Sequence, residues 1–175
     1  MGVEILENRE AWGAEFENGW LAHFRKTGEM DWSRYNRPTN EKAPSGLGID
    51  AAQARLVLIS TAGGYLAEEQ VPFDAPNPLG DYTLRIFPTA TAFEDIAFAH
   101  THYDHRAVDA DPEVLLPLRL LEKMEPEGEI GELTESVISV MGYQPVVTRV
   151  LDELIPAVLA KVEEQGAQAA LLVPA

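Results

Sequence analysis

The chain has 175 residues, a formal net charge of −16 and no cysteine. This length suits one domain built around a single hydrophobic core. The acidic balance argues against nucleic acid or an anionic membrane as a partner, because both reward clustered Lys and Arg. The lack of cysteine excludes disulfides, zinc–thiolate sites and thiol chemistry by these residues. No apolar run approaches the roughly 20 residues of a membrane-spanning helix, and the acidic N-terminus lacks a secretory signal, so we expect a cytoplasmic protein.

The first quarter of the chain differs in pattern from the rest. Residues 3–26 carry apolar side chains at three-to-four spacing, which predicts an amphipathic helix. Residues 29–48 lack periodicity and contain two prolines, which predicts an irregular arm. We expect the helix and arm (1–48) to pack on a core formed by residues 49–175, so that 1–175 is a single domain.

Beyond the arm, strand and helix patterns alternate. Short β-rich runs predict strands at 55–60, 82–87, 95–100, 136–141 and 170–174. Helices are expected near 89–94, over 112–124 and over 145–165, the last kinked at Pro156 and ended at Gly166. This alternation predicts an α/β fold: a doubly wound, mostly parallel sheet in three layers, Rossmann-like or flavodoxin-like. If the strands are parallel, the segments that follow them share one rim, where α/β proteins keep their sites.

One polar loop, AHTHYDHR at 99–106, holds three of the four histidines. His100, His102, Asp104 and His105 fit the pattern H-x-H-x-D-H, which resembles the metal-binding signature of the metallo-β-lactamase superfamily. That resemblance implies a hydrolase in which imidazoles and carboxylates surround a metal and an activated water. The superfamily takes further histidines from downstream, and none follows His105 here, so we expect no metal site. The histidines then become candidate general acids or bases near neutral pH.

A second resemblance covers residues 55–175, about two-thirds of the chain. The segments that carry it are RLVLISTAGGYL at 55–66, VPFDAPNPLGDYTLRIFP at 71–88, the stretch at 97–133 that begins AFAHTHYDHRAVD, SVMGY at 139–143 and AQAALLVPA at 167–175. In order and spacing they resemble the selenoprotein B family of the glycine, sarcosine and betaine reductases, which includes D-proline reductase subunits.

This resemblance implies an oxidoreductase component that cleaves a C–N bond in a small amino-acid-like substrate. In the family a selenocysteine, sometimes replaced by cysteine, reacts at the α-carbon, and a pyruvoyl group on a separate subunit activates the substrate amine. We therefore expect a partner reductase subunit and a thiol electron donor, and no cofactor within this chain. Association into a homo-oligomer is left open.

The family's selenocysteine directly follows the last strand, so we expect the nucleophile just after Ala175. On this interpretation codon 176 is UGA, and the chain is truncated at its selenocysteine and inactive as it stands. The residues expected to assist the nucleophile are His100, His102, Asp104 and His105. The residues expected to bind substrate are Thr61, Ala62, Gly63, Gly64, Tyr103, Met141 and Gly142, with backbone N–H groups of the glycine-rich turn serving a carboxylate. Two alternatives remain: a non-catalytic relative that binds a small carboxylate or a partner, and a metal-dependent hydrolase that uses the HTHYDH loop.

Overall fold

The protein is described here from a computed structural model, which covers residues 5–42, 45–101 and 103–175. The chain divides into two compact units, Met1–Leu47 and Gly48–Ala175. The expectation that the two pack as a single domain stays a prediction. No helix in the described stretches is long and apolar enough to span a bilayer.

The first unit contains the predicted N-terminal helix. It runs as α1 (Arg9–Phe16), a π-helical turn (Glu17–Leu21) and α2 (Ala22–Thr27), so it begins later than the apolar spacing suggested. Aromatic side chains four residues apart stack along it, with ring centroids 5.1 to 5.8 Å apart: Trp12, Phe16, Trp20 and Phe24. The arm is irregular, as expected, apart from a 3₁₀ turn at Trp32–Arg34, and its Tyr35 meets three of these rings edge-on.

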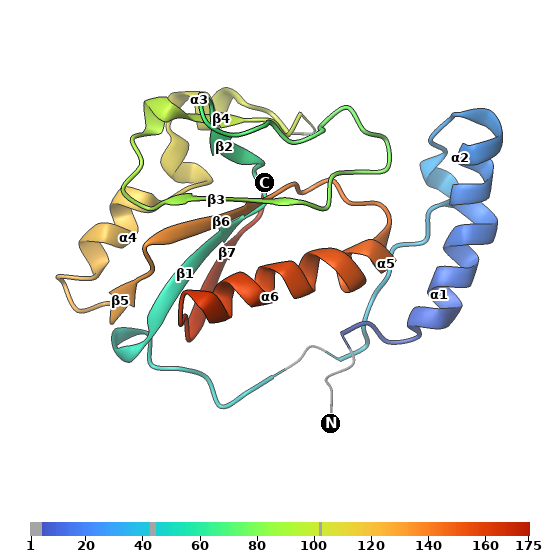
Figure 1. Ribbon diagram of the computed structural model, residues 1–175. Helices are drawn as coiled ribbons and strands as arrows, with labels where there is room; N and C mark the ends of the chain where they lie inside the picture. Colours follow the sequence, from blue (N-terminus) through green and yellow to red (C-terminus); the bar gives the residue numbers. More distant parts are fainter. Residues whose placement is uncertain (1–4, 43–44, 102) are drawn as a thin grey trace. The chain divides into compact units, whose positions relative to one another are not determined.

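The second unit is built on a five-stranded, mostly parallel sheet, which confirms the predicted α/β class (Figure 1). Its strands are β1 (Arg55–Ser60), β3 (Leu84–Pro88), β5 (Glu132–Leu133), β6 (Ser136–Val140) and β7 (Ala169–Val173). The central strand β1 is parallel to β5, β6 and β7. Because β7 follows β1 from Leu56 to Ser60, β5 and β6 share the opposite edge of β1. The remaining strand, β3, is antiparallel to β6.

Helices cover both faces of this sheet, and the core has a cluster on each. On one face lies the long C-terminal helix, formed by α5 (Val147–Arg149), a π-helical turn (Val150–Leu154) and α6 (Ile155–Glu164). Its apolar stripe packs on buried β1 and β6 residues, including Val57, Ile59 and Ile138. The π-helical turn precedes Pro156, which cannot donate the backbone hydrogen bond of a regular helix. Gly166, with φ +63°, ends the helix as predicted.

The other face carries α4 (Leu118–Met124) and a two-stranded ribbon, β2 (Gly64–Leu66) with β4 (Ile96–Phe98). A short helix, α3 (Arg106–Ala110), follows the histidine loop. Three 3₁₀ turns complete this unit's described helical elements: Ala51–Gln53, Phe93–Asp95 and Pro112–Val114.

Several predicted elements were wrong in detail. The strand predicted at 82–87 is antiparallel, so Phe87 and Pro88 lie at the opposite end of the sheet from the other strand exits. The strand predicted at 95–100 belongs to the ribbon instead of the main sheet. The helix predicted over 112–124 is interrupted at Pro117, and the one near 89–94 is only a 3₁₀ turn.

Candidate functional site

The candidate site begins where β1 and β6 end side by side. Ser60 is in register with Ser139, and the next residues form a bridge between Ala62 and Met141. The N–H of Gly63 donates to the carbonyl of Val140 at 3.0 Å. The glycine-rich turn at 61–64 and the segment at 141–142, predicted to lie together, therefore do so. We call this end of the sheet the strand-exit rim.

His100 lies against these two segments. It is only 4% exposed, and the N–H of the preceding Ala99 donates to the carbonyl of Gly63 at 3.0 Å. A Cβ at Gly142 would lie 2.8 Å from Nε2 of His100, and a Cβ at Gly63 would lie 3.0 Å from the backbone nitrogen of His100. Gly63 also has φ +69°, a conformation that side chains disfavour. Glycine at 142 thus makes room for the buried imidazole, and glycine at 63 makes room for the backbone of His100 and the side chain of Met141.

The histidine loop folds back on itself through Tyr103. The Tyr103 ring stacks on His105 with centroids 4.5 Å apart and meets His100 edge-on at 5.2 Å. Nε2 of His105 lies 2.5 Å from the carbonyl oxygen of His100, so this nitrogen carries the hydrogen that the carbonyl accepts. The Tyr103 hydroxyl donates to the carbonyl of Ala62 at 3.5 Å. Burial, with the nearby charge of Asp109, raises the pKa of Tyr103 to about 12.

The carboxylate of the same loop has a different partner. Asp104 accepts hydrogen bonds from the side chain and the backbone N–H of Arg106, and these lower its pKa below the usual value. His102 falls outside the described residues. Among the residues that are described, no group of three or more His, Cys, Asp or Glu side chains is placed to hold a metal. The geometry therefore adds nothing in favour of a metal-dependent hydrolase.

The end of β7 reaches the same rim. The N–H of Thr61 donates to the carbonyl of Val173 at 3.0 Å, and the N–H of Ala175 donates to Oγ1 of Thr61 at 2.9 Å. The residues after β7 are thus attached to the glycine-rich turn, on the side of β1 away from β6.

The backbone N–H groups of the turn are largely used within the fold. Thr61 and Gly63 donate to strand carbonyls, and the N–H of Ala62 lies 3.3 Å from Oγ of Ser60. Three of the four N–H groups expected to serve a carboxylate are therefore already paired. The substrate-binding role of these residues stays a prediction, but it would rest on side chains and on Gly64.

Sequence reasoning missed the loop between β2 and β3, which packs beside the rim. Phe73 and Ala75 form a buried cluster with Met141, and the guanidinium of Arg85 lies 4.3 Å from the centre of the Phe73 ring. Arg85 also donates to the carbonyl of Val71 at 2.8 Å. In the sequence these residues were noticed only as part of a segment that resembles the family. Apolar periodicity identifies single helices and strands, and it does not show which distant segments are in contact.

Two further residues attach this loop to the chain after β6. The N–H of Val146 donates to the Tyr82 hydroxyl at 2.8 Å, and the Tyr143 hydroxyl donates to the carbonyl of Pro78 at 3.0 Å. Gly80 has φ +82°, and a Cβ there would lie 2.7 Å from the carbonyl oxygen of Tyr143. Burial raises the pKa of Tyr143. The loop at 71–83 therefore holds one side of the rim in place.

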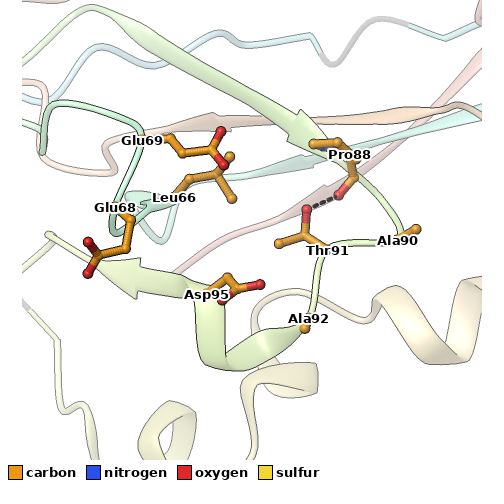
Figure 2. A pocket seen from close by; sticks show the side chains of 8 residues that line it. All are labelled: Leu66, Glu68, Glu69, Pro88, Ala90, Thr91, Ala92 and Asp95. Carbon is orange, nitrogen blue, oxygen red and sulfur yellow. Dashed lines mark hydrogen bonds between the residues drawn. The ribbon is translucent and has the colours of Figure 1, made fainter.

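A surface cavity of about 550 Å³ lies elsewhere, at the far end of β2 and β3 from the rim. Figure 2 shows its lining residues, which come from the last residues of β2 and β3 and from the segments between these strands' ends and β4: Leu66, Glu68, Glu69, Pro88, Ala90, Thr91, Ala92 and Asp95. The lining has three carboxylates and no basic side chain. None of the residues predicted for the site lines it.

The fold and the rim define an α/β protein whose polar residues gather where parallel strands end. Residues 35–174 match the family model described as glycine/sarcosine/betaine reductase selenoprotein B. The chain therefore belongs to this family, as the sequence resemblance predicted.

Two curated relatives are each 27% identical to the chain. One, the sarcosine reductase complex component B subunit beta of Peptoclostridium acidaminophilum, aligns with 81% of the chain and 33% of its own length. The other, the D-proline reductase subunit gamma of Acetoanaerobium sticklandii, aligns with 66% of the chain and 47% of its own length. The chain thus spans a third to a half of the relatives it matches. No solved structure matches it.

Proposed function

We propose that the chain is a component of a reductase that cleaves a C–N bond in a small amino-acid-like substrate, using a selenocysteine or cysteine just after Ala175. Family membership and the names of the two relatives support the reductase class. The observation that carries the proposal is the hydrogen bond from the N–H of Ala175 to Oγ1 of Thr61. This bond attaches the end of the described chain to the glycine-rich turn, which supports a position at the rim for the next residue.

The chemistry proposed for this position needs a nucleophile and an acid. A selenol ionises more readily than a thiol, so it is an anion at neutral pH without a base beside it. The selenolate would bond to the α-carbon as the C–N bond breaks, and the amine would leave with the electron pair and a proton. The histidine loop, with His100, His102, Asp104 and His105, is the proposed source of that proton. A dithiol donor would then supply two electrons: the C–Se bond breaks, the α-carbon of the product takes a proton, the selenolate is regenerated, and the dithiol becomes a disulfide.

The remaining parts of the reaction would come from outside these residues. We propose that a pyruvoyl group on a separate subunit activates the substrate amine, in keeping with relatives named as subunits of reductases. The reducing cytoplasm is the proposed compartment, because it keeps selenols and thiols free.

The gene sequence tests the nucleophile directly. We expect codon 176 to be UGA, or an in-frame cysteine codon to follow within about ten codons. The chain extended by its own codons, with cysteine at position 176, should then reduce one of glycine, sarcosine, betaine or D-proline in the presence of a dithiol and its partner subunit. A UAA or UAG codon with no cysteine beyond it would refute the proposal.

The placement of that nucleophile has a separate test that does not need the substrate. Thr61→Val keeps the shape of the side chain but removes the acceptor for the Ala175 N–H. Amide exchange at Ala175 should therefore rise about fivefold, which corresponds to the loss of one hydrogen bond of about 1 kcal/mol. Thr91→Val is the matched control, because the Thr91 hydroxyl bonds to Pro88 at the other end of the sheet. Equal exchange at Ala175 in both variants would contradict the placement.

A further inference from the structure

Strand β7 forms an edge of the sheet, and this edge is apolar and exposed. Its described pairing is with β1 alone. Leu172 is 65% exposed and Leu171 is 37% exposed. The strand Ala169–Val173 contains no charged residue and no proline, which are the features that usually prevent an edge strand from pairing with another chain.

The backbone of β7 presents its free edge in a symmetric way. The carbonyl of Val173 accepts from Thr61 and so points toward β1. Since the backbone groups of successive strand residues point to opposite sides, Leu171 and Ala169 also face β1, whereas Ala170 and Leu172 face outward. The two outward residues lie on either side of Leu171.

We propose that β7 pairs antiparallel with β7 of a second copy of this chain, about a two-fold axis that passes beside Leu171. In that register Ala170 of each copy exchanges two backbone hydrogen bonds with Leu172 of the other copy. The N–H and C=O groups of both outward-facing residues are then paired in each copy. On the α6 side of the sheet, the large Leu172 lies beside the small Ala170 of the second copy. On the α4 side, the two Leu171 side chains meet.

The uncharged edge permits a contact with a second copy, whereas the net charge of the chain and the small buried area keep that contact weak. The chain carries a net charge of −16, yet residues 167–175 include no charged side chain, so two copies can meet here without like charges in the strands. A pair of five-residue strands buries well under the roughly 800 Å² per partner of a stable interface. The dimer should therefore be weak and concentration-dependent, with a dissociation constant on the order of 10 to 100 µM.

Cysteine cross-linking tests the register, because the chain has no cysteine of its own. In Leu171→Cys, the new thiols would face each other in a non-hydrogen-bonded pair with Cα atoms about 4.5 Å apart, within the range of a disulfide. In the control Leu172→Cys, the thiols would be diagonal neighbours about 7 to 8 Å apart. Under a mild oxidant the first variant should form at least about tenfold more disulfide dimer than the second, although Leu172 is the more exposed residue.

Sedimentation of the purified 175-residue chain across this concentration range tests the contact itself. The unmodified chain should shift from monomer to dimer, and Leu172→Lys should abolish the shift. Leu120→Lys on α4, at a position that is 56% exposed, should leave it unchanged. A chain that stays monomeric up to about 500 µM, well above the expected dissociation constant, would overturn the proposal, and a different protein would then be the candidate partner of this edge. Equal cross-linking of the two cysteine variants, or dimerisation that survives Leu172→Lys, would overturn it as well.

Discussion

The contact between Gly142 and His100 makes a quantitative prediction about the rim. In Gly142→Ala, the new Cβ would lie 2.8 Å from Nε2 and 3.1 Å from Cδ2 of His100, and 3.2 Å from the carbonyl oxygen of Thr61. The imidazole is buried and the carbonyl belongs to the backbone, so neither moves away freely. Overpacking of this kind costs about 1 to 3 kcal/mol, and the lower chain entropy of alanine returns about 0.4 to 1 kcal/mol. We expect a net loss of about 1 to 2 kcal/mol, or about 2 to 8 °C in Tm for a chain of this size.

Gly64→Ala is the matched control for this substitution. Gly64 belongs to the same rim, but its new Cβ would meet its nearest neighbour, Cδ1 of Leu116, at 3.4 Å, an ordinary contact. Its free energy of unfolding should change by less than about 0.5 kcal/mol. Urea unfolding gives both values, and NMR of the imidazole signals shows whether the His100 ring moves in Gly142→Ala. Equal stabilities of the two variants, with an unmoved His100 signal, would refute the packing described here.

Three further predictions concern the side chains around the rim. Arg85→Lys keeps the charge but loses the planar contact with Phe73 and the fork of hydrogen bonds, so hydrogen exchange of residues 71–75 should quicken as about 1 to 2 kcal/mol is lost. Burial alone would raise the pKa of Asp81, but hydrogen bonds from Thr83 and the Asp74 N–H outweigh it and hold the pKa below 3.8. The stabilising contribution of Asp81 is therefore present above pH 3.8 and is lost as the pH falls through its lower pKa in the folded protein. Asp81→Asn should remove this part of the pH dependence of the free energy of unfolding. The pKa of Tyr103 in the folded protein, about 12, exceeds the ordinary value of 10.0, so its stabilising contribution is present below pH 10 and lost as the pH rises toward 12. Tyr103→Phe should remove a phenolate signal that appears near pH 12 in an ultraviolet titration.

Local patterns were enough to predict the elements that depend on local chemistry. The apolar run at 55–60 is β1, because a strand buried on both faces has a continuous apolar sequence. The long helix ends at Gly166 as expected, because glycine readily adopts the left-handed conformation that ends a helix. The direction of β3 was not predictable in this way, since parallel and antiparallel strands can have the same apolar alternation. The ribbon of β2 and β4 was missed for a related reason. Three-residue strands are too short for periodicity to assign them to one sheet or another.

The candidate site was predicted in part for the same physical reasons. The rule that parallel strands deliver their following loops to one rim brought Ala62 and Met141 together, as the structure has them. It gave no information on the loop at 71–83, whose Tyr82 hydroxyl accepts a hydrogen bond from the N–H of Val146, 64 residues later. It also took the N–H groups of the glycine-rich turn to be free. Pairing of those groups depends on which strands are neighbours, and a single sequence does not contain strand order.

These used N–H groups change what the rim is suited to do. A strand exit that binds an anion keeps several N–H groups unpaired and pointing outward. Here the N–H groups of Gly63 and Thr61 donate to carbonyls of β6 and β7. The hydroxyl of Thr61 accepts a hydrogen bond from the N–H of Ala175. The turn therefore bonds to the chain that follows β7, while its Gly63 lies against the backbone of His100. Because the turn bonds to a segment of its own chain, the proposed reactive group on that segment is a simpler interpretation of the rim than a ligand bound by the N–H groups of the turn.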